Sequence, residues 1–110
     1  MFAVLFEVML KPERRQEYFD IAASLRSELE RIDGFISVER FASLSTEGKY
    51  LSLSFWRDEA AVRRWREHAR HHGAQARGRA EIFDDYRIRV VQTVRDYGMT
   101  DREEAPQEAP

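Results

Sequence analysis

The chain contains no cysteine, which excludes disulfide bonds, thiolate nucleophiles and cysteine-based zinc or iron–sulfur sites. No apolar run is long enough to span a bilayer, and the apolar start Met1–Leu10 lacks the basic n-region of a signal peptide. An excess of one charge is also missing, because 18 Lys and Arg stand against 20 Asp and Glu. This balance gives no electrostatic reason to expect nucleic acid or an anionic membrane as partner. We therefore expect a cytoplasmic protein.

The residues that are present have the balance of a soluble globular domain, 43% hydrophobic and 35% charged over 110 positions. This length supports one modest hydrophobic core. Residues 1–98 are predicted to form the domain. Residues 99–110 are rich in Asp, Glu, Pro and Ala without an apolar period, and they are predicted to form a disordered acidic tail.

Hydrophobic periodicity predicts four strands and two helices. Apolar spacings of three and four indicate helices, whereas alternation of apolar and polar residues indicates strands. The predicted elements are a strand Phe2–Leu10, a helix Glu13–Ile32, strands Phe35–Leu44 and Lys49–Trp56, a helix from Glu59 interrupted near Gly73 and Gly78, and a strand Tyr86–Val94. Their β-α-β-β-α-β order predicts a ferredoxin-like α+β subunit, with an antiparallel four-stranded sheet and helices on one face.

The first predicted strand is apolar on both faces, so both faces need to be covered. A ferredoxin-like sheet has helices on one face only, and we expect the aromatic and hydroxyl side chains of the third strand on the open face. The simplest cover for an apolar open face is a second copy of the chain. The pattern therefore predicts a homodimer.

Glu7 is the only charged residue in the first strand. Burying a lone carboxylate is costly unless it is paired. The favoured interpretation is an ion pair with Arg87 or Arg89 on the last strand. The functional alternative is a pocket carboxylate that acts as a base on an enolisable or phenolic substrate.

His68 and His72 are four residues apart and share one face of a helix. They could line a pocket and act on a phenolic substrate, or they could be exposed on a polar helix. No further His, Cys or paired carboxylate stands at ligand spacing, so no metal site is predicted. The Arg-rich segment Arg57–Arg79 could attract an anionic ligand or pair with acidic neighbours as a solvated face.

Three stretches carry a resemblance to a known family: LSLSFWRDEAAVRRWREH (Leu51–His68), HHGAQARGRAEIFDDYRIRV (His71–Val90) and VVQTVRDYG (Val90–Gly98). With the opening strand, Lys11-Pro12 and the first helix, they resemble the antibiotic biosynthesis monooxygenase (ABM) family over the first 98 residues. The resemblance implies a dimeric α+β barrel in which each subunit encloses a pocket between its sheet and its helices. It also implies oxidation of aromatic polyketides by O2 without metal or flavin in some members, and haem degradation in others.

Carried over by residue, the resemblance is partial. Trp65 matches the family's tryptophan on the second helix. The haem degraders also use an asparagine on the first strand, but this chain contains no asparagine, and Phe6 or Glu7 fills that position. Their histidine stands farther from the tryptophan than His68 does, where this chain has Gln75.

The resemblance therefore predicts a small cofactor-independent monooxygenase acting on an aromatic or polyketide-like molecule. The alternatives are a haem or hydrophobic-metabolite binding protein and a non-catalytic dimeric barrel. Aromatic residues could form a pocket wall or pack as simple core. The predicted catalytic residues are Glu7, Trp65, His68 and His72, and the predicted substrate-binding residues are Tyr50, Ser52, Ser54, Trp56, Phe83 and Tyr86.

Overall fold

The computed structural model describes residues 1–71 and 83–107, with side chains for 1–69 and 83–107. The β-α-β-β-α-β order is confirmed. The elements are β1 (Phe2–Leu10), a 3-10 turn η1 (Pro12–Arg14), α1 (Arg15–Glu30), β2 (Phe35–Ala42), β3 (Lys49–Trp56), α2 (Glu59–His71) and β4 (Phe83–Gln92). β4 begins before the predicted Tyr86 because Phe83 pairs with Leu10 beyond a shift in register. The break predicted near Gly73 and Gly78 lies outside the described residues.

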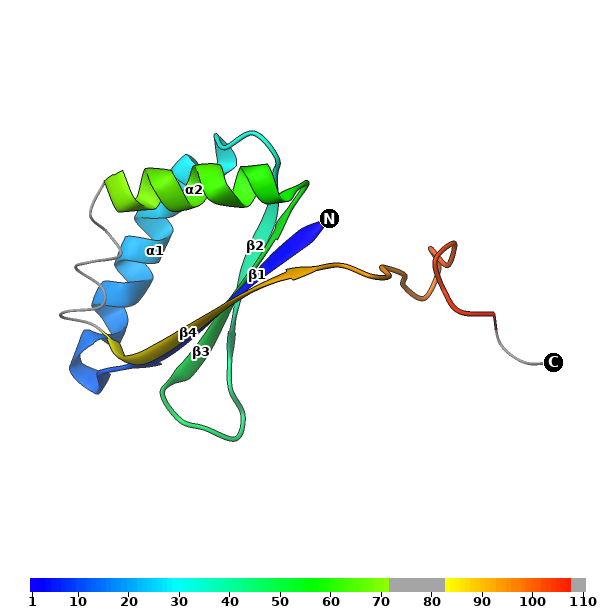
Figure 1. The fold of residues 1–110 in the computed structure, drawn as a ribbon. Coiled ribbons are helices and arrows are strands. Elements are labelled where there is room, and N and C mark those ends of the chain that lie inside the picture. The colour runs from blue at the N-terminus through cyan, green and yellow to red at the C-terminus, as the bar shows by residue number, and fades with distance from the viewer. Residues whose placement is uncertain (72–82, 108–110) are drawn as a thin grey trace.

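The four strands form one antiparallel sheet in the order β2-β3-β1-β4. β1, which is apolar on both faces, lies inside the sheet between β3 and β4. Figure 1 shows α1 and α2 on the same side of this sheet. The observed architecture is therefore the predicted ferredoxin-like α+β fold, with helices on one face.

The core lies between the helices and the sheet in two clusters. One lies between the start of α2, the end of α1 and strands β2 and β3, and contains Leu29, Val38, Trp56, Ala61 and Val62. The other lies under the start of α1 and contains Val8, Leu10 and Tyr18. Because both clusters use the even-numbered residues of β1, this set of side chains faces the helices.

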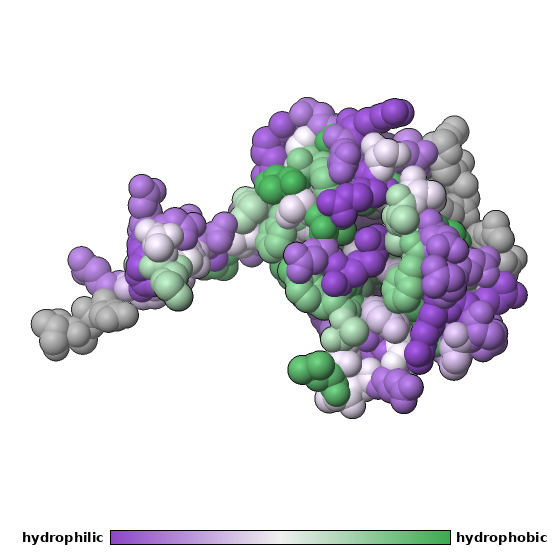
Figure 2. Space-filling model, turned by 180° about the vertical axis from the view of Figure 1, so that it is seen from behind, coloured by the Kyte–Doolittle hydropathy of each residue, from purple (hydrophilic) through white to green (hydrophobic). Residues whose placement is uncertain are grey.

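The prediction that the aromatic and hydroxyl side chains of β3 lie on the open face is wrong. Trp56 pairs with Phe2, and Ser54 pairs with Val4, so the aromatic and hydroxyl side chains of β3 face the helices. The open face instead carries the other set, which includes Leu53 and its partner Leu5. Figure 2 shows hydrophobic side chains exposed among hydrophilic ones on the rear of the molecule. The hydroxyl groups are therefore interior, and the open face carries apolar side chains such as Leu5 beside charged ones such as Glu7.

The start of α2 is fixed by charged side chains. The Oδ1 atom of Asp58 accepts a 2.9 Å hydrogen bond from the backbone N–H of Ala61, so Asp58 caps the N-terminus of the helix. Arg57 donates to both carboxylate oxygens of Asp33, at 3.0 and 3.1 Å. Hydrogen bonding from Arg57 lowers the pKa of Asp33, and the Ala61 backbone N–H, followed by Arg57, lowers the pKa of Asp58. The interpretation of this part of the Arg-rich segment as a solvated, paired face is confirmed.

Beyond β4 the chain leads away from the sheet (Figure 1). The Thr93 N–H still donates to the carbonyl of Met1 at 2.8 Å. The contacts that follow are local: the Gly98 N–H donates to the carbonyl of Asp101 at 3.0 Å, and the Asp96 N–H donates to Glu104 at 2.7 Å. The division of the chain after residue 98 stays a prediction. None of the helices in the described part is both long enough and apolar enough to cross a membrane.

Candidate functional site

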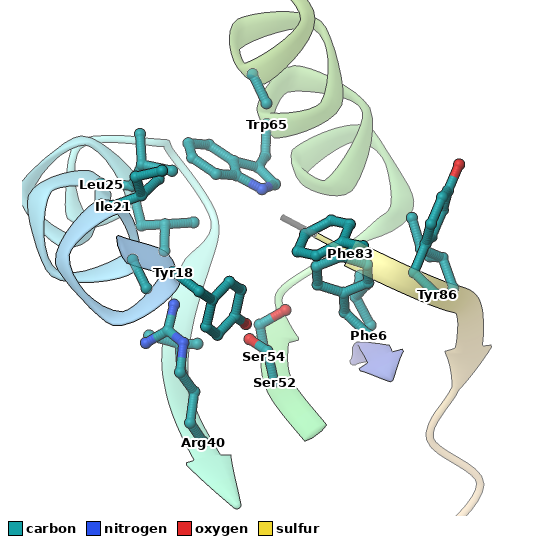
Figure 3. Close-up of a pocket in the computed structure, with 16 residues that line it drawn as sticks. Phe6, Tyr18, Ile21, Leu25, Arg40, Ser52, Ser54, Trp65, Phe83 and Tyr86 are labelled. Atoms are coloured by element: carbon teal, nitrogen blue, oxygen red, sulfur yellow. The ribbon is translucent and has the colours of Figure 1, made fainter. Parts of the chain in front are cut away.

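A cavity of about 180 Å³ lies between the helices and the covered face of the sheet. Its walls are mainly apolar and come from all four strands and both helices. They include Val4, Phe6, Ile21, Leu25, Trp65 and Phe83. Figure 3 shows Trp65 and the α1 side chains on one side, and Phe6 with Phe83 on another. Such a concave, largely apolar space is typical of a small-molecule site.

The polar part of the cavity is formed by Tyr18, Arg40, Ser52 and Ser54. Figure 3 shows these four side chains gathered together, away from Trp65. Strand register explains the arrangement, because Arg40 pairs with Ser52, and Ser52 pairs in turn with Phe6 of β1. One row across the sheet therefore changes from charged to hydroxyl to aromatic. The cavity has a polar end and an apolar end.

Arg40 brings a positive charge into this lining. Its Nε atom is buried and has no hydrogen-bond partner among the described residues. The same strand places Val38 in the core two residues earlier, so Arg40 projects toward the helices as well. Sequence reasoning missed Arg40 because an arginine on an alternating strand is usually solvated. The signal in the sequence was its position two residues after the apolar Val38, because residues two apart on a strand project to the same side.

Ser54 differs from Ser52 because its hydroxyl already has a partner. The indole N–H of Trp56 donates to the Ser54 hydroxyl oxygen at 2.9 Å, and both side chains are buried. The hydroxyl can still donate its own hydrogen toward the cavity. The Ser54 hydroxyl thus both satisfies the core tryptophan and contributes to the lining.

Four of the six predicted substrate-binding residues line the cavity: Ser52, Ser54, Phe83 and Tyr86. Tyr86 stands at the edge in Figure 3, with its hydroxyl turned away from the other labelled side chains. The remaining two lie elsewhere. Trp56 is completely buried in the core, and Tyr50 packs edge-on against Phe19 with 5.2 Å between the ring centroids.

Trp65 is the one predicted catalytic residue found in the described lining. His68 stacks on it with 5.7 Å between ring centroids, and the His68 Nε2 atom lies 3.6 Å from Glu28 Oε2. His72 lies outside the described residues. Within the described part of the chain, no three His, Cys, Asp or Glu side chains gather as a metal site.

Glu7 projects from the open face of the sheet, opposite the cavity. Its Oε2 atom lies 3.4 Å from Arg89 Nη1 and 3.7 Å from Lys49 Nζ. The predicted ion pair with the last strand is therefore confirmed, and of the two predicted partners the one that forms it is Arg89. Glu7 does not belong to the described lining of the cavity.

Comparison with known proteins supplies the family. The model of the antibiotic biosynthesis monooxygenase family matches residues 1–77. The chain belongs to this family. A jasmonate monooxygenase, ABM, of Pyricularia oryzae strain 70-15 is 53% identical over 92 residues. This match covers 84% of the chain but only 43% of that relative, so the chain spans less than half the relative's length.

Solved structures agree on the ABM fold. Rv0793 of Mycobacterium tuberculosis has a TM-score of 0.73, with 18% identity over 88% of this chain and 98% of that one. A MhuD variant with two manganese protoporphyrin IX molecules per active site has a TM-score of 0.69. It is 17% identical, over 89% of this chain and 99% of that chain. At these identities the likeness establishes the fold alone.

Proposed function

We propose that this ABM-family chain is a monooxygenase whose substrate, a small and largely apolar organic molecule, binds in the cavity. The observation that carries the proposal is the cavity itself, with apolar walls and the family-matched Trp65 in its lining. The 53% identity to a jasmonate monooxygenase over 92 residues supports the same reaction class. A packed, non-catalytic barrel is not favoured, because the side chains of the described residues do not fill the space between sheet and helices.

The chemistry that we propose uses O2 and an activated methylene group of the substrate, without an added reductant. Loss of a proton gives a carbanion that reduces O2. One oxygen atom becomes the carbonyl oxygen of the product, and the other leaves as water together with both methylene hydrogens, so the substrate supplies all four electrons. The chain contributes a water-poor cavity and a fixed orientation.

The predicted catalytic residues have different places in this proposal. Trp65 contacts the substrate because it lines the cavity. His68 lies behind Trp65 and acts as a positioning residue through ring stacking. Glu7 is assigned no catalytic step, because its carboxylate lies on the opposite face of the sheet. His72 remains a prediction.

We also propose that the active form is a homodimer. The open face of the sheet carries Leu5 and Leu53 opposite each other, with Phe55 near them on the same face. Neither helix of the chain covers this face (Figure 1). The resemblance to dimeric barrels supports a second copy as its cover.

Haem does not fit the described part of the site. In the lining that the structure describes, no histidine is available as an axial ligand, and the chain has no asparagine. Binding of an apolar metabolite without turnover remains the second candidate, favoured by the apolar walls alone. Oxygen consumption separates the two candidates, because a protein that binds without turnover consumes no oxygen.

The test is oxygen uptake by the purified full chain with anthrone and with jasmonic acid, each with and without NADH and flavin. Uptake that matches substrate loss one to one supports the proposal. Ile21→Trp, which fills the cavity, should abolish this uptake, whereas Ser27→Trp on the exposed face of the same helix should retain it. Binding without any uptake would overturn the monooxygenase assignment and leave the binding protein.

A further inference from the structure

Among the described residues, the cation at the polar end of the cavity has no counterion. Arg40 lines the cavity, and its buried Nε atom has no hydrogen-bond partner in the described part of the chain. The neighbouring acid on the same strand, Glu39, pairs with Leu53 and therefore belongs to the open face. No carboxylate of the described residues forms an ion pair with Arg40.

A guanidinium taken out of water is costly unless an anion and hydrogen bonds replace its hydration. The surroundings of Arg40 are suited to complete such a pair. Ser52, which pairs with Arg40 across the strands, and Tyr18 both line the cavity and carry hydroxyl donors. Figure 3 shows the Arg40 side chain beside the Tyr18 ring. The group that fits between these donors is an anion.

The rest of the cavity defines the body that this anion carries. From Arg40 the row across the sheet continues through Ser52 to Phe6 and Ile88. This row spans three strand spacings, roughly 14 Å between the β2 and β4 backbones. Apolar side chains line most of that length, so the complementary ligand has a charged group at one end and an apolar body.

We propose that the cavity binds an apolar carboxylic acid, with the carboxylate held by Arg40 and the apolar body between Phe6 and Trp65. A guanidinium binds a carboxylate through two parallel N–H···O bonds, and one arginine balances its single charge. Arg40 is thus a specificity-determining residue, and it fixes which end of the substrate reaches the apolar side. This inference rests on the proposed function, because it names the substrate class of the same site.

The test compares an acid with its uncharged ester. The probes are jasmonic acid and methyl jasmonate, with decanoic acid and methyl decanoate as a second pair, titrated into the full chain by calorimetry. We expect at least about tenfold tighter binding of each acid, because only the acid forms the charge-assisted pair. Equal binding of acid and ester, or binding of neither, would overturn the inference.

Variants assign the preference to Arg40. Arg40→Met keeps the length of the side chain without its charge, and it should remove the preference for the acid while ester binding is kept. Arg40→Lys should retain part of the preference, and Arg63→Met on the exposed face of α2 should leave it unchanged. A preference that persists in Arg40→Met would overturn the assignment. Thermal melting verifies folding; Arg40→Met should melt at or above the parent temperature because a buried Nε–H group without an acceptor is removed.

Failure of the carboxylate site can be distinguished from failure of the proposed monooxygenase function. Acid-selective binding without oxygen uptake would overturn the monooxygenase and keep the carboxylate site. Oxygen uptake that is equally efficient with esters and acids would keep the monooxygenase and overturn the role of Arg40.

Discussion

The buried indole N–H of Trp56 donates a hydrogen bond of 2.9 Å to the hydroxyl oxygen of Ser54. The two residues are on the same strand and project to the same side. Trp56 is completely buried, so the Ser54 hydroxyl is what satisfies its polar atom. This contact joins the core to the cavity lining.

Ser54→Ala should therefore destabilise the fold. The buried indole N–H would lose its acceptor, which costs about 1–3 kcal/mol in the free energy of unfolding. Ser52→Ala is the matched control on the same face and should change that free energy by less than about 0.5 kcal/mol. Urea denaturation measures both. Equal losses in the two variants would contradict the importance of the indole contact.

Gly34 connects α1 to β2 with a φ of +96°, and a Cβ atom placed there would lie 2.6 Å from the Ala61 Cβ. Gly34→Ala should destabilise the fold by about 2–5 kcal/mol, because left-handed strain and overpacking act together. Gly48 is the control: its φ is +82°, but the nearest atom is the Nη2 of Arg15, at 3.2 Å. Gly48→Ala should cost about 1–2 kcal/mol, since that flexible side chain can move. A smaller loss for Gly34→Ala than for Gly48→Ala would contradict the close approach of α2.

The cap of α2 predicts a pH dependence. The pKa of Asp58 is lowered from 3.8 in the folded chain, so the ionised carboxylate stabilises the fold above about pH 4. This stabilisation is lost as the pH falls from 3.8 through the lowered folded pKa. Asp58→Asn keeps a cap acceptor without the charge, and its melting temperature should fall below that of the parent at pH 7 and approach it near pH 3. Asp58→Ala, which lacks the acceptor too, should stay below Asp58→Asn at both pH values.

The sequence predicted the order of the elements well because that order depends on local periodicity. It did not predict which face of β3 meets the helices, because β1, its neighbour, is apolar on both faces and fits either way. Only the pairing of Trp56 with Phe2 decides the question. The same long-range register brings Arg40 to Ser52, two residues separated by a hairpin, so the position of Arg40 beside Ser52 was not predictable from spacing.

The open face of the sheet predicts the assembly state. Leu53→Asp would place a charge opposite Leu5 in the proposed interface, and it should convert the dimer to a monomer in sedimentation velocity at micromolar concentration. Ala23→Asp introduces the same group on the exposed side of α1 and should remain dimeric. A monomeric parent chain at that concentration would refute the proposed dimer.

The stacking of His68 on Trp65 separates positioning from acid–base catalysis. If His68 only holds the indole against the cavity, His68→Ala should lower kcat/KM by about tenfold through misplacement of Trp65. His68→Phe should then restore most of the activity, because a phenyl ring still stacks but carries no proton to transfer. A histidine acting as base would instead leave both variants equally inactive, since neither can take up a proton. The kcat/KM of the two variants, measured across pH with the substrate found by oxygen uptake, therefore decides which role His68 has.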